Sequence, residues 1–126
     1  MTLAMVNGPS WVGVVTRDLE GQRRFYRDVL GLPEVAARGR WVWFDLGDGR
    51  QLELVEATDE EPTESEPGVQ VGFAAEDVHA AREALIARGA EPVGEIAGGP
   101  KSGSLWCYFR DADGNVFQIN QRLASP

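Results

Sequence analysis

The chain contains the stretch WVGVVTRDL at residues 11–19, and a similar stretch, QVGFAAEDV, follows at residues 70–78. A second pair of similar stretches is WVWFDLGDG at 41–49 and WCYFRDADG at 106–114. Repeated supersecondary units place equivalent residues around a shared axis. Each copy begins with one of the first two stretches and closes with a short motif, LEL at 52–54 or FQI at 117–119. The first residue of each opening stretch and the central residue of each closing motif are therefore the positions to inspect for a functional site: Trp11, Glu53, Gln70 and Gln118.

The first copy predicts the element order strand, helix, strand, strand, strand. Residues 10–16 alternate and are β-branched, as in strands, and Asp18 is a candidate helix N-cap. Apolar residues then recur at helical spacing, which predicts a helix that packs through them: Leu19, Tyr26, Val29 and Leu30. Gly31 should end this helix. Three strands should follow, with the Asp48-Gly49 hairpin turn between the last two: about 34–38, 40–46 and 51–57.

The second copy predicts the same elements again. Residues 69–75 should form a strand, Asp77 should cap a helix, and Gly89 should end it. The remaining strands are expected at three places: near 92–97, 104–110 and 115–122. The glycine-rich segment 98–103 makes this copy longer, and it is either a lid over a site or a plain surface loop.

These elements predict an α+β fold. The 126 residues suit one domain made of two modules, about 9–57 and 69–122, with an acidic linker over 58–68. The net charge of −8 argues against nucleic acid and anionic membranes as partners. A single cysteine, no apolar run of about 18 residues and no signal peptide at the N-terminus favour a cytoplasmic location.

Strand parity separates two faces of the expected sheets. One face is apolar and should pack on the helices, with Cys107 as a small core residue. The other combines aromatic rings with a few polar groups, which is typical of a ligand cavity, although a dimer interface has a similar composition. The expected ligand-binding residues share that second face: Trp11, Trp41, Trp43, Glu53, Gln70, Trp106, Tyr108 and Gln118.

Three motifs together resemble the vicinal oxygen chelate superfamily, which contains glyoxalase I, bleomycin-resistance proteins and extradiol dioxygenases. They are WVGVVTRDL at 11–19, FYRDVLGL at 25–32 and FRDADGN at 109–115. The resemblance implies paired β-α-β-β-β modules with curled mixed sheets around a central cavity. It also implies homodimers, and metal ligands, usually His and Glu, at the four equivalent positions of the repeat.

The residues at these four positions argue against a metal. Trp11 and Gln70 stand where the resemblance implies histidines, and Gln118 stands where Glu is common, so Glu53 is the one good ligand. Zinc and similar ions need at least three protein donors of imidazole, thiolate or carboxylate type. We therefore expect no metal and no other cofactor. His79, the single histidine, is expected on the surface of the second helix.

Three classes of function remain open. The first is a metal-free small-molecule-binding protein that sequesters an aromatic or cationic compound, such as an antibiotic, by stacking on tryptophan. The second is an enzyme of the same superfamily, a lyase, isomerase or dioxygenase acting on a small oxygenated substrate. The third is a module that binds a protein partner. Glu53 is the only candidate catalytic residue, as an acid or base. A simpler role for its carboxylate is to bind a ligand cation, or to accept a hydrogen bond from Arg110 or Gln118.

Overall fold

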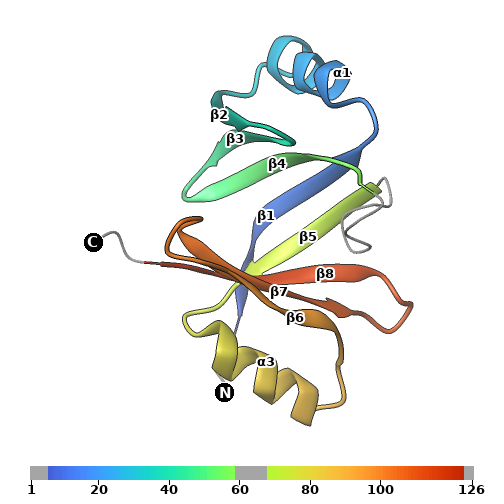
Figure 1. The fold of residues 1–126 in the computed structure, drawn as a ribbon, viewed down its shortest axis with the longest axis vertical. Coiled ribbons are helices and arrows are strands. Elements are labelled where there is room, and N and C mark those ends of the chain that lie inside the picture. Colours follow the sequence, from blue (N-terminus) through green and yellow to red (C-terminus); the bar gives the residue numbers. More distant parts are fainter. Residues whose placement is uncertain (1–5, 59–67, 124–126) are drawn as a thin grey trace. The chain divides into compact units, whose positions relative to one another are not determined.

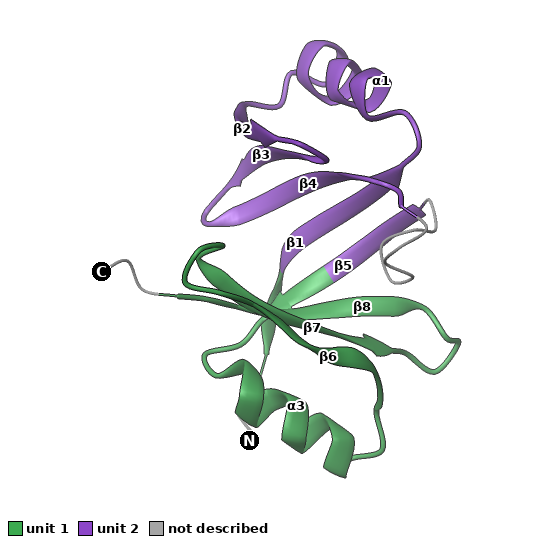
Figure 2. Ribbon diagram, viewed as in Figure 1, with its two compact units in different colours: residues 1–9, 72–126 green, residues 10–71 purple. Residues whose placement is uncertain are grey.

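A computed structural model describes residues 6–58 and 68–123 of the chain (Figure 1). Nearly all of the predicted acidic linker, residues 59–67, lies outside the described residues. The chain divides into two compact units (Figure 2), of which one is Ser10–Val71 and the other holds the described residues of 1–9 and 72–126. None of the described helices is long and apolar enough to cross a membrane.

The Ser10–Val71 unit contains the strands and helices of the first sequence copy. Its elements are β1 (Asn7–Thr16), whose first residues belong to the other unit, α1 (Leu19–Arg24), the π-helix η1 (Phe25–Val29), β2 (Glu34–Arg38), β3 (Trp41–Gly47) and β4 (Arg50–Glu56). The strand order is β2-β3-β4-β1, with β1 parallel to β4 and the other pairs antiparallel. This is the predicted strand-helix-strand-strand-strand module.

The other unit contains the elements of the second copy. They are β5 (Gly68–Ala74), whose last residues belong to this unit, α3 (Val78–Ala87), β6 (Glu91–Gly99), β7 (Ser104–Arg110) and β8 (Val116–Arg122). The strand order is β5-β8-β7-β6, again with one parallel pair, β5 and β8. Both units therefore hold mixed sheets with a helical connection, and the α+β prediction is confirmed.

The strand registers of the two units match residue for residue. In the first copy, Glu53 of β4 lies between Gly13 of β1 and Trp43 of β3. In the second, Gln118 of β8 lies between Gly72 of β5 and Tyr108 of β7. The repeat seen in the sequence is thus a repeat of structure, in which a glycine, a polar residue and an aromatic residue form one row across three strands.

Each unit has its own hydrophobic core on the helix side of its strands. Val14, Val42, Phe44 and Leu54 are buried beneath α1 in the first copy, where Tyr26 also packs. In the second, a larger set packs beneath α3: Val78, Ala81, Cys107, Phe109 and Ile119. Cys107 is fully buried in this core, as expected for a small apolar residue.

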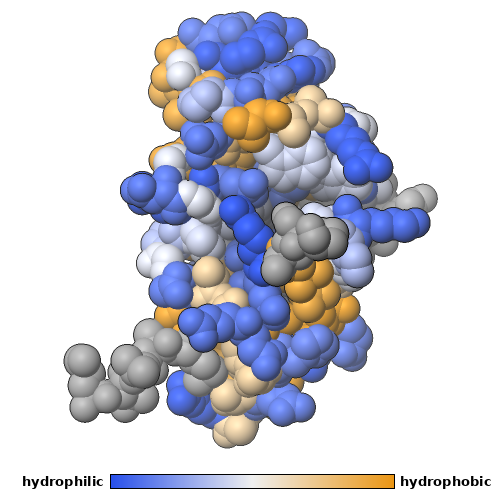
Figure 3. Space-filling model, turned by 90° about the vertical axis from the view of Figure 1, so that its left-hand side faces the viewer, coloured by the Kyte–Doolittle hydropathy of each residue, from blue (hydrophilic) through white to orange (hydrophobic). Residues whose placement is uncertain are grey.

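The first helix differs from the prediction in its second half. Asp18 caps it as expected, because Oδ1 accepts from Gly21 N at 3.0 Å. From Phe25 the helix is of the π type, and Leu30 N donates to Phe25 O five residues earlier. The wider turn changes the helical phase. Val29 and Leu30 are therefore 70% and 55% exposed instead of packed, and hydrophobic side chains reach the surface near α1, at the top of Figure 3.

The turns follow the predicted chemistry. Asp48 and Gly49 both have positive φ, 54° and 76°, as a two-residue hairpin turn of the favoured hand requires. The glycine-rich segment 98–103 joins β6 directly to β7 as a tight turn, in which Gly103 N donates to Gly99 O at 3.0 Å. The choice between a lid and a plain surface loop stays a prediction from the sequence.

Candidate functional site

Trp11 and Glu53 lie on neighbouring strands of one unit and are joined by their side chains. The indole Nε1–H of Trp11 donates to Glu53 Oε1 over 2.9 Å. The two residues belong to adjacent rows of the same face, because Trp11 pairs with Gln51 and Gly13 pairs with Glu53. Trp11 is only 9% exposed and Glu53 is partly buried, so this hydrogen bond is partly shielded from water.

Gly13 provides the space that the indole of Trp11 occupies. A Cβ at Gly13 would lie 2.5 Å from Cζ2 and 2.8 Å from Cζ3 of Trp11, closer than real side chains come. The ring therefore lies over the backbone of β1 at Gly13. Since Gly13 is next to Glu53 in the register, this placement brings the indole N–H within reach of the carboxylate.

Trp43 approaches Glu53 from the opposite side. It pairs with Glu53 between β3 and β4, and its indole lowers the pKa of the carboxyl, as a nearby N–H donor does. Burial raises the pKa of Glu53 from 4.5 to about 7, while the hydrogen bonds from Trp11 and Trp43 favour the ionised form and oppose that rise. Near neutral pH the carboxyl is therefore divided between its protonated and ionised forms.

Glu53 takes no part in the ion pairs found among the described residues. Arg110, which the sequence offered as a partner, lies 3.8 Å from Glu91 and donates to Gly114 O at 3.0 Å. A partly buried carboxylate flanked by two indoles attracts a cation, or otherwise takes up a proton. Glu53 could therefore bind a cationic ligand or exchange a proton with a ligand.

Trp41 lies on the same face one row further along. It pairs with Val55 of β4, two residues from Glu53. The guanidinium carbon of Arg40 lies 5.1 Å from the centre of the Trp41 ring, and Arg40 Nη2 donates to Glu56 O at 3.0 Å. Trp41 thus already has a cation, Arg40, over its ring. The aromatic residues next to Glu53 are Trp11 and Trp43.

The corresponding row of the second unit is neutral. Gln118, only 6% exposed, accepts from Asn120 Nδ2 at 2.9 Å, and its Nε2 lies 3.5 Å from the hydroxyl of Tyr108. The ring of Trp106 lies over Gly98, where a Cβ would come within 2.7 Å of Cζ3. Each unit therefore places a tryptophan over a glycine, and in the first unit the indole donates to a carboxylate.

Seven of the eight predicted ligand residues thus fall into two groups. Glu53 accepts from Trp11 and is paired with Trp43 on the neighbouring strand, with Trp41 in the next row. Tyr108 and Gln118 touch one another in the other unit, where Trp106 is two residues from Tyr108. Gln70 is partly buried in β5. That all eight line one cavity stays a prediction from the repeat.

The residues at the four equivalent positions do not fit a metal ion. Trp11 presents an N–H donor to Glu53, and an indole has no lone pair to offer a cation in the ring plane. The side-chain oxygen of Gln118 is already an acceptor for Asn120. Among the described residues, no group of three or more His, Cys, Asp and Glu side chains is placed to hold a metal. His79 is exposed on α3, as expected.

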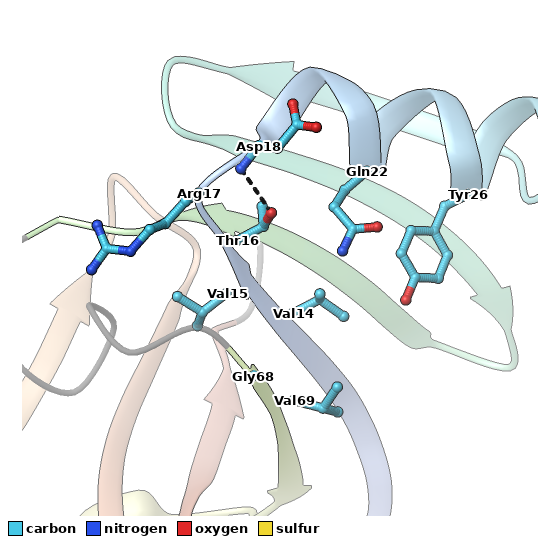
Figure 4. A pocket seen from close by; sticks show the side chains of 9 residues that line it. All are labelled: Val14, Val15, Thr16, Arg17, Asp18, Gln22, Tyr26, Gly68 and Val69. Atoms are coloured by element: carbon cyan, nitrogen blue, oxygen red, sulfur yellow. Dashed lines mark hydrogen bonds between the residues drawn. The ribbon is translucent and has the colours of Figure 1, made fainter.

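A surface pocket of about 480 Å³ lies on the other side of β1, between the start of α1 and the start of β5. Figure 4 shows Gln22 and Tyr26 pointing from the helix towards the strand that carries Val14. Thr16 Oγ1 accepts from Asp18 N at 2.9 Å, and Asp18 caps the helix, so both serve local structure. This pocket was not predicted from the sequence, because the spacing of Val14 and Tyr26 indicated only that they pack in the core.

Comparison with solved structures shows the same fold in several proteins. Methylmalonyl-CoA epimerase from Mycobacterium tuberculosis superposes with a TM-score of 0.82 at 22% identity, over 98% of this chain and 93% of that chain. A Streptomyces coelicolor methylmalonyl-CoA epimerase variant in complex with 2-nitronate-propionyl-CoA gives 0.75 at 20% identity, over 98% and 100%. A superfamily member from Vibrio splendidus 12B01 gives 0.62 at 21% identity, over 87% and 95%.

The sequence itself matches one family model over most of its length. The model describes the glyoxalase/bleomycin resistance protein/dioxygenase superfamily, and it matches residues 8–119. No curated protein matches the chain. The matched region includes both copies of the repeat and all eight predicted ligand residues. The chain therefore belongs to the glyoxalase/bleomycin resistance protein/dioxygenase superfamily, as its resemblance to the vicinal oxygen chelate proteins implied.

Proposed function

We propose that this protein binds a small aromatic or cationic molecule, without a metal, at the carboxylate of Glu53. The observation that carries this proposal is the contact of one partly buried carboxylate with two indoles, Trp11 at 2.9 Å and Trp43 from the opposite side. A cation placed there gains the charge of Glu53 and the faces of aromatic rings. Cation–π contacts are worth roughly 0.5–2 kcal/mol each. Sequestration of a toxic compound fits such a site.

The low solvent exposure of the site strengthens this attraction. Desolvation is the largest influence on the pKa of Glu53, and it acts by destabilising the negative charge. A bound cation would relieve that destabilisation and shift Glu53 to its ionised form. The net charge of −8 also favours approach of a cation over approach of an anion.

The test uses two probes that share one aromatic ring. Phenethylammonium carries a positive charge at pH 8, and phenethyl alcohol does not. We expect tryptophan fluorescence to report tighter binding of the ammonium, and Glu53→Gln to weaken it by about tenfold to a hundredfold, as loss of a charge-assisted hydrogen bond does. Glu56→Gln is the matched control, because Glu56 is exposed at the end of the same strand. Equal binding of both probes contradicts recognition of a cation by Glu53.

A second candidate function is proton transfer by Glu53 in an enzyme of the superfamily. The observation that favours it is the pKa of about 7, which suits a general acid or base at neutral pH. The solved structures with the same fold include methylmalonyl-CoA epimerases, so methylmalonyl-CoA is the first substrate to try. Incubation in D₂O, followed by mass spectrometry, distinguishes the two: deuterium uptake that Glu53→Gln abolishes supports the enzyme, and no uptake supports the binding protein.

A further inference from the structure

Glu53 has a limited number of free acceptor positions for a ligand. An ionised carboxylate offers about four lone-pair sites on its two oxygens. Trp11 takes one of those on Oε1 through a 2.9 Å hydrogen bond. The indole of Trp11 also covers the neighbouring backbone at Gly13, which fixes the position of its N–H beside Oε1.

This occupancy affects two kinds of organic cation differently. A guanidinium is planar and binds carboxylates best through two parallel N–H···O bonds, one to each oxygen. An ammonium is a compact point charge that needs a single oxygen. Because Trp11 takes one acceptor site of Oε1, a guanidinium that bridges both oxygens must share Oε1 with the indole, whereas an ammonium can bind Oε2 alone.

We propose that Trp11, seated over Gly13, makes the Glu53 site selective for ammonium over guanidinium cations. This inference rests on the proposed function and names the ligand class of the same site. Trp11 is a specificity-determining residue in this account. Gly13 is a positioning residue, because a side chain there would displace the indole and so release Oε1.

The test compares phenethylammonium with phenethylguanidinium, which share the same aromatic group. The unmodified protein should bind the ammonium about tenfold more tightly, the factor that one charge-assisted hydrogen bond provides. Trp11→Phe keeps a ring over Gly13 but removes the N–H, and it should reduce that preference to about threefold or less. Gly13→Ala should act in the same direction through displacement of Trp11.

Gly99→Ala is the matched glycine control, because Gly99 does not have a positive φ and a Cβ there meets nothing within 4 Å. It should leave the preference unchanged. A readout without ligand accompanies the binding data: the titration midpoint of the Glu53 carboxyl, followed by NMR, should rise in Trp11→Phe and in Gly13→Ala. A merely structural role of Gly13 would lower the melting temperature without moving that midpoint.

The outcomes separate the two proposals. If neither cation binds, the proposed function is wrong and the selectivity is wrong with it. If both cations bind equally, or if the preference is the same in Trp11→Phe and Gly13→Ala as in the unmodified protein, only the selectivity is wrong. If the titration midpoint of Glu53 is the same in both variants as in the unmodified protein, the proposed roles of Gly13 and Trp11 are wrong, regardless of the binding results.

Discussion

Replacing Glu53 with glutamine should remove a large pH dependence of stability. The pKa of this carboxyl is 4.5 in ordinary surroundings and about 7 in the folded protein. Between these values the folded state binds more protons than the unfolded state, so the free energy of unfolding falls as pH rises. The contribution of Glu53 to the free energy of unfolding is therefore complete below pH 4.5. It is lost as pH rises through 7. Glutamine does not titrate, so it should abolish this slope.

The magnitude follows from the two pKa values. Integrating proton binding from pH 5 to pH 8 gives a loss of about 2–3 kcal/mol of unfolding free energy from Glu53 alone. Carboxyls whose pKa is lowered in the fold, such as Glu34 beside Arg23 and Asp111 beside Asn115, lose their contribution at more acid pH. Burial raises the pKa of the Cys107 thiol, which acts above this range. Among the described groups whose pKa is shifted, Glu53 is therefore the one that titrates between pH 5 and 8.

Urea unfolding at several pH values is the suitable assay. Urea is uncharged, whereas guanidinium is itself a cation that would compete at Glu53. The unmodified protein should lose about 2–3 kcal/mol more between pH 5 and 8 than Glu53→Gln does. Glu56→Gln, on the same strand, should behave like the unmodified protein. Parallel pH profiles of the unmodified protein and Glu53→Gln would refute the assignment of a raised pKa to Glu53.

The remaining predictions concern the ligand, the metal and the oligomeric state. Trp43→Ala should weaken phenethylammonium binding by about tenfold in a fluorescence titration, since stacking and burial together exceed 1.4 kcal/mol; unchanged affinity would place the ligand elsewhere. Purified protein should show no stoichiometric zinc, iron, nickel or manganese by mass spectrometry, and submicromolar zinc affinity would contradict the donor argument. Sedimentation should show a homodimer, which Val29→Lys should weaken because Val29 is 70% exposed beside other exposed apolar residues; a monomer at micromolar concentration would exclude it.

Strand positions were predictable because both copies alternate strictly and end in recognisable turns. β2 and β7 have the predicted bounds, 34–38 and 104–110. The shared face of Trp11, Trp43 and Glu53 was predictable for the same reason, since side chains alternate along a strand. The register then confirmed that Glu53 and Gln118 are equivalent.

Other features depend on contacts that a one-dimensional pattern does not contain. The π-helical turn at Phe25 preserves the apolar spacing in the sequence but changes the direction in which Val29 and Leu30 point. The 2.9 Å bond between Trp11 and Glu53 depends on the absence of a side chain at Gly13. Gly13, two residues after Trp11, is the sequence feature that could have indicated this contact, because a glycine within a strand often marks the close approach of another group.

One measurement tests the link between Glu53 and a bound cation most directly. Calorimetric titration of the unmodified protein with phenethylammonium, in two buffers of different ionisation enthalpy, counts the protons released on binding. A pKa of about 7 predicts release of about three-quarters of a proton at pH 6.5 and almost none at pH 8.5. Binding with no proton release at pH 6.5 would contradict the account, because the cation would then be held by groups other than Glu53.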